Sequence, residues 1–519
     1  MDNFIINIPY SDISSSPVSH AGIARCRYRF VECSSFVRRE ALRVIEFVDL
    51  PKQPYSTVSY VWRGLIRDEE DTSPIMSVDG AEGADPISIE VFRLACVASL
   101  KRGCELLWLD GLCIIQADDG DKAWQIQRMY TIYESCKTCV IIPGGLSRLT
   151  RITDETSWMS RAWTLQEAIA PPSADVLFAW EGGSCRLDSM FTVIVEEVEP
   201  STAAISNFEW LLAFQTRGRC RMQSIDEDGT SIGEEREMRQ PFGSQFFGGD
   251  GAAFSALTGA LHMRGKKGLS GAIWRSSFVR SAKYPVDMVF SIMGILGVSL
   301  DTTKFSKDDR LGATVALMRE LLARGERAEW LAIATKMEVN PDASFLPIFP
   351  KPSPAGKPVI DVDGKLESPS KYINSVWNLD GGPTGEMTDA GVFRFEAHTA
   401  RIRPGLDNPS TEDGASSFKS AKEDKWVLGK SEGREIYAAF VGTRSVYTNG
   451  FVPSVSTLQS HVLMLLERDG EGRFYCIGYA EVEGHLLQGP NWSMQKLEND
   501  FSNLLSLPYE LDRFLGLLE

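Results

Sequence analysis

Two periods of hydrophobic and polar residues alternate over the first 180 residues. Short apolar runs rich in β-branched and aromatic residues lie at 55–62 (YSTVSYVW), 106–110 (LLWLD) and 138–142 (TCVII). Between them, over 89–100 and 126–133, apolar residues recur every three or four positions. The runs predict buried strands and the spaced residues predict amphipathic helices. The succession strand, helix, strand, helix, strand predicts a parallel α/β sheet.

The pattern changes further along the chain. A short helix is predicted at 163–170, and from about 190 to 345 the apolar spacing is mostly helical. A Gly-rich and acidic segment at 224–251 predicts a mobile loop inside that region. Beyond residue 350, strand-like runs joined by glycine turns predict a β-rich region with a hairpin at Asp469 to Gly472. A polar segment at 403–425 within it is predicted to be disordered.

At 519 residues the chain exceeds the size that one hydrophobic core usually serves, so we expect several domains. The predicted fold class is α/β, with a helical region and a β-rich domain after the parallel sheet. The predicted parts are an N-terminal segment at 1–44, the α/β domain at 45–190, a mostly helical region at 191–349 and the β-rich C-terminal domain at 350–519.

Charge and cysteine content narrow the possible partners. The chain has 54 Lys and Arg against 70 Asp and Glu, a formal net charge of −16, which argues against nucleic acid as the main ligand. Ten cysteines in a chain of this length do not make a disulfide scaffold, and residues 1–12 lack the pattern of a signal peptide. The most apolar window, 286–300, is too short to span a bilayer and predicts a buried helix. We therefore expect a cytoplasmic protein with reduced thiols and no membrane span.

Most local motifs have a structural explanation. Cys136 and Cys139 form a CxxC pair without the second pair or the nearby histidines that a zinc site needs. The glycines of 248–261 lack the lysine of a phosphate-binding loop, and no G-x-S-x-G marks a nucleophile at a strand-to-helix turn. We expect no metal and no bound cofactor.

A candidate site follows from the geometry of a parallel sheet, in which ligands bind beyond the carboxyl ends of the strands. Trp62 and Arg63 follow the first predicted strand, Asp110 ends the second, and the block RAWTLQE follows the third. Within that block Trp163 and Glu167 are four residues apart and share a helical face. The alternative is that Trp163 anchors the core while Glu167 pairs with a base such as Arg161, and the residue pattern alone favours this alternative.

Three blocks, YSTVSYVWRG, LLWLDGLCIIQADDGDKAWQIQRMYTIYESC and SRAWTLQEAI, resemble in order and spacing the motifs of the fungal heterokaryon-incompatibility (HET) domain. The resemblance covers roughly residues 50–185, and the segment 280–298 is similar to one that often follows this domain. Two positions depart from the pattern, since Arg63 interrupts the usual Trp-Gly pair and Ile115 stands where Asn is common. These departures affect local turn contacts.

The HET domain is itself similar to the Toll/interleukin receptor (TIR) domain, a flavodoxin-like fold whose enzymatic members cleave NAD at the nicotinamide glycosidic bond. SRAWTLQE resembles the TIR pattern that carries the catalytic glutamate, which implies Glu167 as the catalytic residue. The resemblance further implies a set of residues around NAD: Tyr60, Trp62, Arg63, Asp110 and Trp163. NAD would be the substrate rather than a cofactor.

The resemblance implies two functions of different classes. The first is an innate-immune type cell-death effector of heterokaryon incompatibility with NAD glycohydrolase activity, assembling into homo-oligomers on activation. The second is a non-catalytic HET module that triggers programmed cell death by self-assembly or partner binding. In either case the C-terminal region could bind a protein partner.

Overall fold

The computed structural model describes residues 4–499 except 190, 215–218, 227, 240, 243, 249, 334, 337–348, 363, 374–376, 390, 406–416, 432, 447–457 and 489–490. The chain forms two compact units. Unit 1 comprises residues 1–254, 290–295 and 301–304, and unit 2 comprises residues 255–289, 296–300 and 305–519.

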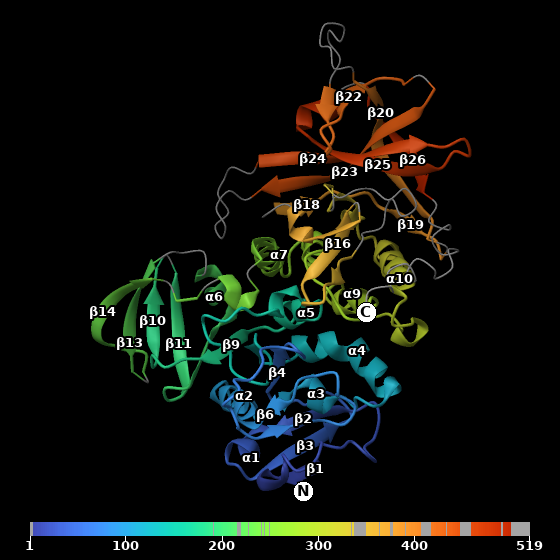
Figure 1. The fold of residues 1–519 in the computed structure, drawn as a ribbon. Helices are drawn as coiled ribbons and strands as arrows, with labels where there is room; N and C mark the ends of the chain where they lie inside the picture. Colours follow the sequence, from blue (N-terminus) through green and yellow to red (C-terminus); the bar gives the residue numbers. More distant parts are fainter. Residues whose placement is uncertain are drawn as a thin grey trace. The chain divides into compact units, whose positions relative to one another are not determined.

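The centre of unit 1 is a parallel sheet, as the hydrophobic pattern predicts (Figure 1). Its strands lie side by side in the order β7-β4-β8-β9. Three of them match the predicted runs closely: β4 (Tyr55–Tyr60), β7 (Leu106–Trp108) and β8 (Thr138–Ile142). The fourth parallel strand is β9 (Ala174–Ala179). The expected helices between them are confirmed as α2 (Ile89–Lys101), α4 (Asp119–Glu134) and α5 (Thr164–Ile169).

Strand β4 is covered on both faces, and every one of its residues is buried. Successive side chains of a strand point to opposite faces. Ser56 Oγ donates a 2.7 Å hydrogen bond to Ser99 of α2 on one face. On the other face Tyr55 bonds to the carbonyl of Ile132 in α4, and Ser59 bonds to Glu167 of α5. The small hydroxyl side chains of this strand therefore join the sheet to helices on both sides.

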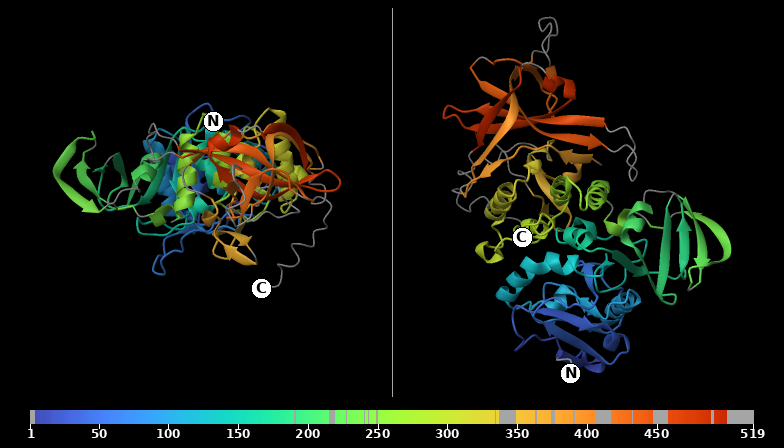
Figure 2. Two further views of the ribbon diagram at one scale, coloured as in Figure 1. Left: turned by 90° about the horizontal axis from the view of Figure 1, so that it is seen from above. Right: turned by 180° about the vertical axis from the view of Figure 1, so that it is seen from behind.

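Antiparallel strands extend the sheet beyond β9 in the order β12-β11-β10-β13-β14, shown in green in Figure 2. These strands are β10 (Cys185–Asp188), β11 (Thr192–Glu199), β12 (Ala203–Asn207), β13 (Arg219–Ile225) and β14 (Ser231–Arg239). The prediction of a mostly helical region is therefore wrong over 192–239, where the one α-helix of the described part is α6 (Phe208–Phe214).

The predicted mobile loop at 224–251 is also wrong over much of its length, because β14 pairs with β13 and η3 (Ser244–Phe247) follows. β14 lies at the sheet edge and is rich in charged residues, as edge strands often are. Arg219 and Arg221 of β13 form ion pairs with Glu237 and Glu235 of β14. A charged edge strand and a polar loop have similar compositions, which explains the error.

The N-terminal residues belong to the same sheet, in the order β1-β3-β2 next to β7. Their bounds are β1 (Phe4–Pro9), β2 (Tyr28–Glu32) and β3 (Ala41–Phe47), with α1 (Cys33–Val37) between the last two. The predicted boundary at residue 44 therefore falls inside β3. Arg29 of β2 and Asp121 of α4 form a fully buried ion pair that ties this extension to the parallel centre.

Unit 2 combines helices with antiparallel sheets. Its α-helices include α8 (Leu269–Ser277) and α10 (Arg310–Ala323), while α7 (Gly251–His262) and α9 (Asp287–Met293) cross the limits of the units. The smaller strands of the chain are β5 (Ile75–Met76) and β6 (Ile87–Ser88) in unit 1 and β15 (Lys351–Pro352), β16 (Pro358–Val362), β17 (Lys365–Glu367), β18 (Trp377–Asp380), β19 (Gly385–Met387), β21 (Ser417–Lys419) and β22 (Lys425–Leu428) in unit 2. The long strands are β20 (Phe393–Pro404), β23 (Glu435–Val446), β24 (Leu458–Arg468), β25 (Phe474–Val482) and β26 (Ser493–Asn499).

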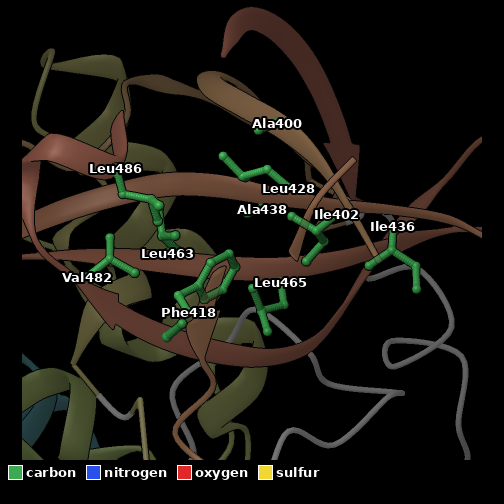
Figure 3. Close-up of a cluster of buried hydrophobic side chains, with 11 residues drawn as sticks. Ala400, Ile402, Phe418, Leu428, Ile436, Ala438, Leu463, Leu465, Val482 and Leu486 are labelled. Carbon is green, nitrogen blue, oxygen red and sulfur yellow. The ribbon is translucent and has the colours of Figure 1, made fainter. Parts of the chain in front are cut away.

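The β-rich character predicted beyond residue 350 is confirmed. The hairpin at Asp469 to Gly472 joins β24 to β25, and Asp469 N–H donates to the carbonyl of Arg473 across it. Aliphatic residues of neighbouring strands form the core of this sheet around Leu463 and Ile402 (Figure 3). Of the segment predicted to be disordered, 403–425, residues 406–416 lie outside the described residues. The prediction is wrong at 417–419, which form β21, and at Arg403 and Pro404, which end β20.

The β-rich sheet packs against helical segments of the same unit. Arg444 of β23 is buried and donates hydrogen bonds to the carbonyl of Ala332 and to Thr335 Oγ1. Separate folding of residues 350–519 stays a prediction. The buried helix predicted at 286–300 is α9, which is shorter than the apolar window. In the described parts of both units, each helix is too short or too polar to cross a bilayer.

Candidate functional site

Three of the predicted site residues meet where β4 and β7 end. Trp62 Nε1 donates a 2.7 Å hydrogen bond to Asp110 Oδ2, and the Tyr60 hydroxyl bonds to the same carboxylate. Asp110 is the first residue of α3 (Asp110–Cys113), and its Oδ1 accepts the backbone N–H of Gly111 at 2.6 Å. Parallel strands bring their carboxyl ends to one edge, which explains why residues 48 positions apart are bonded.

Burial is the main influence on the Asp110 carboxyl and raises its pKa above the usual range. The hydrogen bonds from Tyr60, Trp62 and Gly111 and the positive charge of Arg161 act in the opposite direction. Donors of this kind stabilise the ionised carboxylate, whereas removal from water destabilises it.

The charges of both candidate carboxylates, Asp110 and Glu167, affect the pKa of the Tyr60 phenol. Burial raises its pKa well above the ordinary value, and the charge of Asp110, the hydrogen bond to Asp110 and the charge of Glu167 raise it further, while Arg161 lowers it. Tyr133 of α4 is affected similarly, first by burial and then by Glu167. Both phenols therefore keep their protons near neutral pH and can donate hydrogen bonds. Tyr60 links the Asp110 and Glu167 positions electrostatically.

Glu167 is buried, with 7% of its surface exposed, so it is not the solvated end of a surface helix. Its Oε2 accepts a 2.6 Å hydrogen bond from Ser59 Oγ, near the carboxyl end of β4. Ser59 Oγ in turn accepts a 2.9 Å hydrogen bond from Trp158 Nε1. Trp158 belongs to η2 (Trp158–Ser160) and is packed against Phe208 and Phe247.

The two other predicted residues are more exposed. Trp163 is half-buried and precedes the first residue of α5, and its carbonyl accepts the N–H of Glu167 at 3.4 Å. Arg63 is exposed, and its Nε donates a 3.0 Å hydrogen bond to the carbonyl of Gly83. The structure thus brings Tyr60, Trp62 and Asp110 into direct contact, whereas Arg63 bonds to a neighbouring loop.

Ser59 and Trp158 were not among the predicted site residues, and Arg161 was predicted only as a pairing partner for Glu167. A serine three positions before the predicted end of an apolar strand was the available signal for Ser59, because a polar group buried there needs a partner. Trp158 had no distinguishing signal, since it lies in an irregular segment before the SRAWTLQE block.

The loops that follow β4 and β8 approach closely. Leu65 N–H donates a 2.7 Å hydrogen bond to the carbonyl of Gly144. A Cβ atom on Gly64 would lie 2.0 Å from the Gly144 oxygen, and one on Gly145 would lie 2.9 Å from the Val61 oxygen. The glycines therefore allow backbone to pack on backbone between these strand ends, which fixes the path of the chain after Trp62.

The two cysteines of the CxxC pair have a structural explanation. Cys136 and Cys139 are buried, Thr57 donates to Cys136 Sγ at 3.6 Å, and burial raises the pKa of Cys136 to about 12. All ten cysteines are free thiols. Over the described ranges, His, Cys, Asp and Glu side chains form no group that could hold a metal ion.

Comparison with known proteins gives a family for part of unit 1. Residues 55–153 match the family model described as heterokaryon incompatibility protein (HET). The vegetative incompatibility protein HET-E-1 of Podospora anserina is 26% identical to this chain over 140 residues, which are 24% of this chain and 10% of that protein. The chain therefore matches only a small part of the length of this relative. No solved structure matches the chain.

Proposed function

We propose, from the HET domain at residues 55–153, that this chain acts in heterokaryon incompatibility and the cell death associated with it. We propose further that residues 45–190 form a TIR-like module that cleaves NAD at the nicotinamide glycosidic bond, with Glu167 as the catalytic carboxylate. The observation that carries this proposal is the burial of Glu167 against β4, where Ser59 holds one of its oxygens.

The order of the parallel strands supports a flavodoxin-like assignment. Along the chain β4, β7, β8 and β9 are the first, second, third and fourth of these strands, and in space they lie in the order second, first, third, fourth. This is the beginning of the flavodoxin-like order, whose ligands bind where the strand order reverses. The reversal is at β4, and Tyr60 and Trp62 lie at and just beyond its carboxyl end.

The chemistry requires one well-placed carboxylate. When the bond between the nicotinamide nitrogen and ribose C1′ breaks, its electron pair leaves with the nitrogen, and the cationic pyridinium becomes neutral nicotinamide. The ribosyl group left behind has oxocarbenium character, which a carboxylate beside it stabilises. Water then adds to C1′ and releases a proton, and ADP-ribose is formed. No general acid is needed, because the leaving group is already cationic.

The neighbouring residues suit the binding of a flat, charged substrate. Trp62 and Trp163 are partly exposed, so their rings can stack on a planar group. Asp110, itself bonded to Tyr60, orients the Trp62 ring through the hydrogen bond to Nε1. Arg63 lies at the surface where a guanidinium can meet a phosphate. We assign these residues to NAD binding within the same proposal.

The test is a paired measurement on Glu167→Gln and Glu134→Gln. The first substitution removes the charge of the buried carboxylate, and the second makes the same change at an exposed position of α4. Incubation with NAD, followed by chromatographic detection of nicotinamide, should show a loss of about 100-fold or more for Glu167→Gln and parental turnover for Glu134→Gln. Parental turnover in a folded Glu167→Gln variant would contradict the proposal.

A second candidate function is a non-catalytic module that acts by assembly, and the exposure of Arg63 favours it. An exposed guanidinium beside a half-buried tryptophan is also a common feature of protein interfaces. In this case no NAD would be cleaved by the parent, and toxicity in cells would survive Glu167→Gln but not Arg63→Glu. Self-association on activation and a protein partner for unit 2 belong to both candidate functions.

A further inference from the structure

The carboxylate of Glu167 lies at the end of a short hydrogen-bond chain that starts in the core. Trp158 Nε1 donates to Ser59 Oγ at 2.9 Å, and Ser59 Oγ lies 2.6 Å from Glu167 Oε2. Trp158 and Ser59 are fully buried, and Trp158 is packed edge-on against Phe208. The hydrogen-bond chain therefore starts at a tightly packed side chain. Its three residues belong to η2, β4 and α5.

The chemistry of the first member sets the direction of the whole chain. An indole nitrogen only donates, so Ser59 Oγ must accept the proton of Trp158. The single hydroxyl proton of Ser59 is then available for Glu167, and an ionised carboxylate is an acceptor only. A hydrogen bond donated to the charged form of an acid favours that form. This chain therefore supports Glu167 as an anion in a place where burial acts against a charge.

The charge of Glu167 also affects the pKa values of neighbouring side chains. The charge of Glu167 acts on Tyr60 of β4, Tyr133 of α4 and Cys139 of β8, in each case after the larger effect of burial. Asp110 and Arg161 act on the same tyrosine, Tyr60, with opposite signs. The phenols and the thiol stay neutral near pH 7, so they add no charge of their own around Glu167.

We propose that Ser59, oriented by Trp158, is the positioning residue that keeps Glu167 ionised and fixes the direction of its carboxylate. This inference rests on the proposed function only where it concerns the catalytic use of Glu167 in NAD cleavage. Ser59 itself touches no substrate in this proposal and acts through Glu167. The relationship is specific to one face of β4, because Ser56 on the opposite face bonds to Ser99 instead.

The experiment follows the protonation of Glu167 by NMR in protein labelled with ¹³C at the glutamate carboxyl carbons. The Glu167 signal is identified by its absence from Glu167→Gln. In Ser59→Ala the midpoint of its titration should lie about 1 to 2 pH units higher than in the parent, which corresponds to one hydrogen bond to a charged group. Ser56→Ala is the matched control, since it removes a buried serine hydrogen bond from the same strand and should leave the midpoint unchanged.

A second variant protects the test against poor folding of Ser59→Ala. Trp158→Phe keeps an aromatic ring in the core but removes the indole N–H, which frees the hydroxyl of Ser59 to turn. The Glu167 midpoint should rise here too, by less than in Ser59→Ala. A midpoint that stays at the parental value in both variants, or that moves equally in Ser56→Ala, would overturn the inference.

NAD turnover, measured on the same samples, separates this inference from the proposed function. If the midpoint rises as expected and the parent does not cleave NAD, Ser59 positions Glu167 and the enzymatic proposal fails. If the parent cleaves NAD and the midpoint does not respond to Ser59→Ala, the enzymatic proposal stands and the role of Ser59 fails. When both hold, the pH dependence of turnover should shift in Ser59→Ala in step with the NMR midpoint.

Discussion

Trp62 Nε1 and Asp110 Oδ2 are joined by a 2.7 Å hydrogen bond that connects the chain after β4 to the first residue of α3. The same carboxylate also bonds to Tyr60 and to the N–H of Gly111. A single side chain thus holds two aromatic residues at the strand ends. This contact makes Asp110 a structural requirement of the arrangement.

Asp110→Asn should therefore loosen this edge of the sheet. The amide retains only one acceptor oxygen where the carboxylate accepts three hydrogen bonds, so a buried donor is left without its acceptor, at a cost of about 1–3 kcal/mol. Asp119→Asn, at an exposed position in the first turn of α4, is the control. Urea unfolding of the two variants checks the prediction, and equal stability of both would show that the Asp110 contacts contribute little.

The buried ion pair between Arg29 and Asp121 should be the most sensitive contact of the N-terminal extension. The Asp121 carboxylate accepts a 3.0 Å hydrogen bond from each of the two Arg29 Nη atoms. It also accepts hydrogen bonds from the backbone N–H groups of Cys26 and Ile115. Asp121→Asn leaves a buried guanidinium without its counter-charge, and we expect a loss of about 3–5 kcal/mol.

Glu40→Gln provides the contrast, because Glu40 pairs with Arg38 at the exposed surface, where solvent screens the charges, and should leave the stability almost unchanged. Hydrogen exchange of peptides from β2 and α4 gives the readout. Slow exchange in Asp121→Asn, like that of the parent, would contradict the prediction.

His20 should make unit 1 less stable in mild acid. Its Nε2 lies 2.8 Å from the carbonyl of Leu112, and burial lowers its pKa, with Arg29 acting in the same direction and the Leu112 bond, Asp121 and Asp79 acting against it. A histidine with a lowered folded-state pKa binds more protons when unfolded, so stability falls as the pH drops below about 6.5 toward the folded-state pKa.

His20→Gln should remove this part of the pH dependence, and His485→Gln, at an exposed histidine, should not. The measurement is the difference in urea midpoint between about pH 7.5 and about pH 5. The role of His20 would be excluded if its replacement left that difference unchanged.

Arg444 should be essential for the packing of β23 on the helical part of unit 2. It bonds to Ala332 and Thr335 and forms an ion pair with Glu481. Burial, with a smaller contribution from Arg275, lowers its pKa to about 9, so it still carries a proton at neutral pH. Arg444→Met leaves the buried Ala332 carbonyl and the Thr335 hydroxyl without this donor, and we expect a loss of about 1–3 kcal/mol.

The matched variant is Arg401→Met, which breaks an exposed ion pair with Glu435 in the same sheet and should cost about 0–1 kcal/mol. If Arg444→Met unfolded no more easily than Arg401→Met, residues 350–519 would be stable without this contact, as their predicted separate folding requires. Thermal unfolding of the full chain, monitored by amide hydrogen exchange of peptides from β23, distinguishes the two results.

The sequence by itself determined the parallel centre of unit 1. The bounds of β8 agree with the predicted run, and those of β4 and β7 agree within two residues. This accuracy has a local cause, because each strand is a continuous buried run and each helix has one apolar face, so neighbouring residues carry the signal. The strand character of the C-terminal region and its hairpin were local in the same way.

The local hydrophobic pattern could not predict which strands pair over long distances in the sequence. The residues of β11, β12, β13 and β14 have spacing and charge compatible with helix or loop. They form strands because β9 offers an edge to which β12 pairs and the others follow in turn. A strand's free energy depends on cross-strand neighbours that its own sequence does not specify.

The candidate site shows the same division. The pattern Trp163 to Glu167 was visible in the sequence, but it fitted an exposed ion pair as well as a buried carboxylate. Only the tertiary structure placed Glu167 against Ser59, 108 positions away, and Ser59 against Trp158. Burial and the direction of a hydrogen bond depend on which distant groups come together, because the same carboxylate is weakly held in water and strongly oriented in a packed interior.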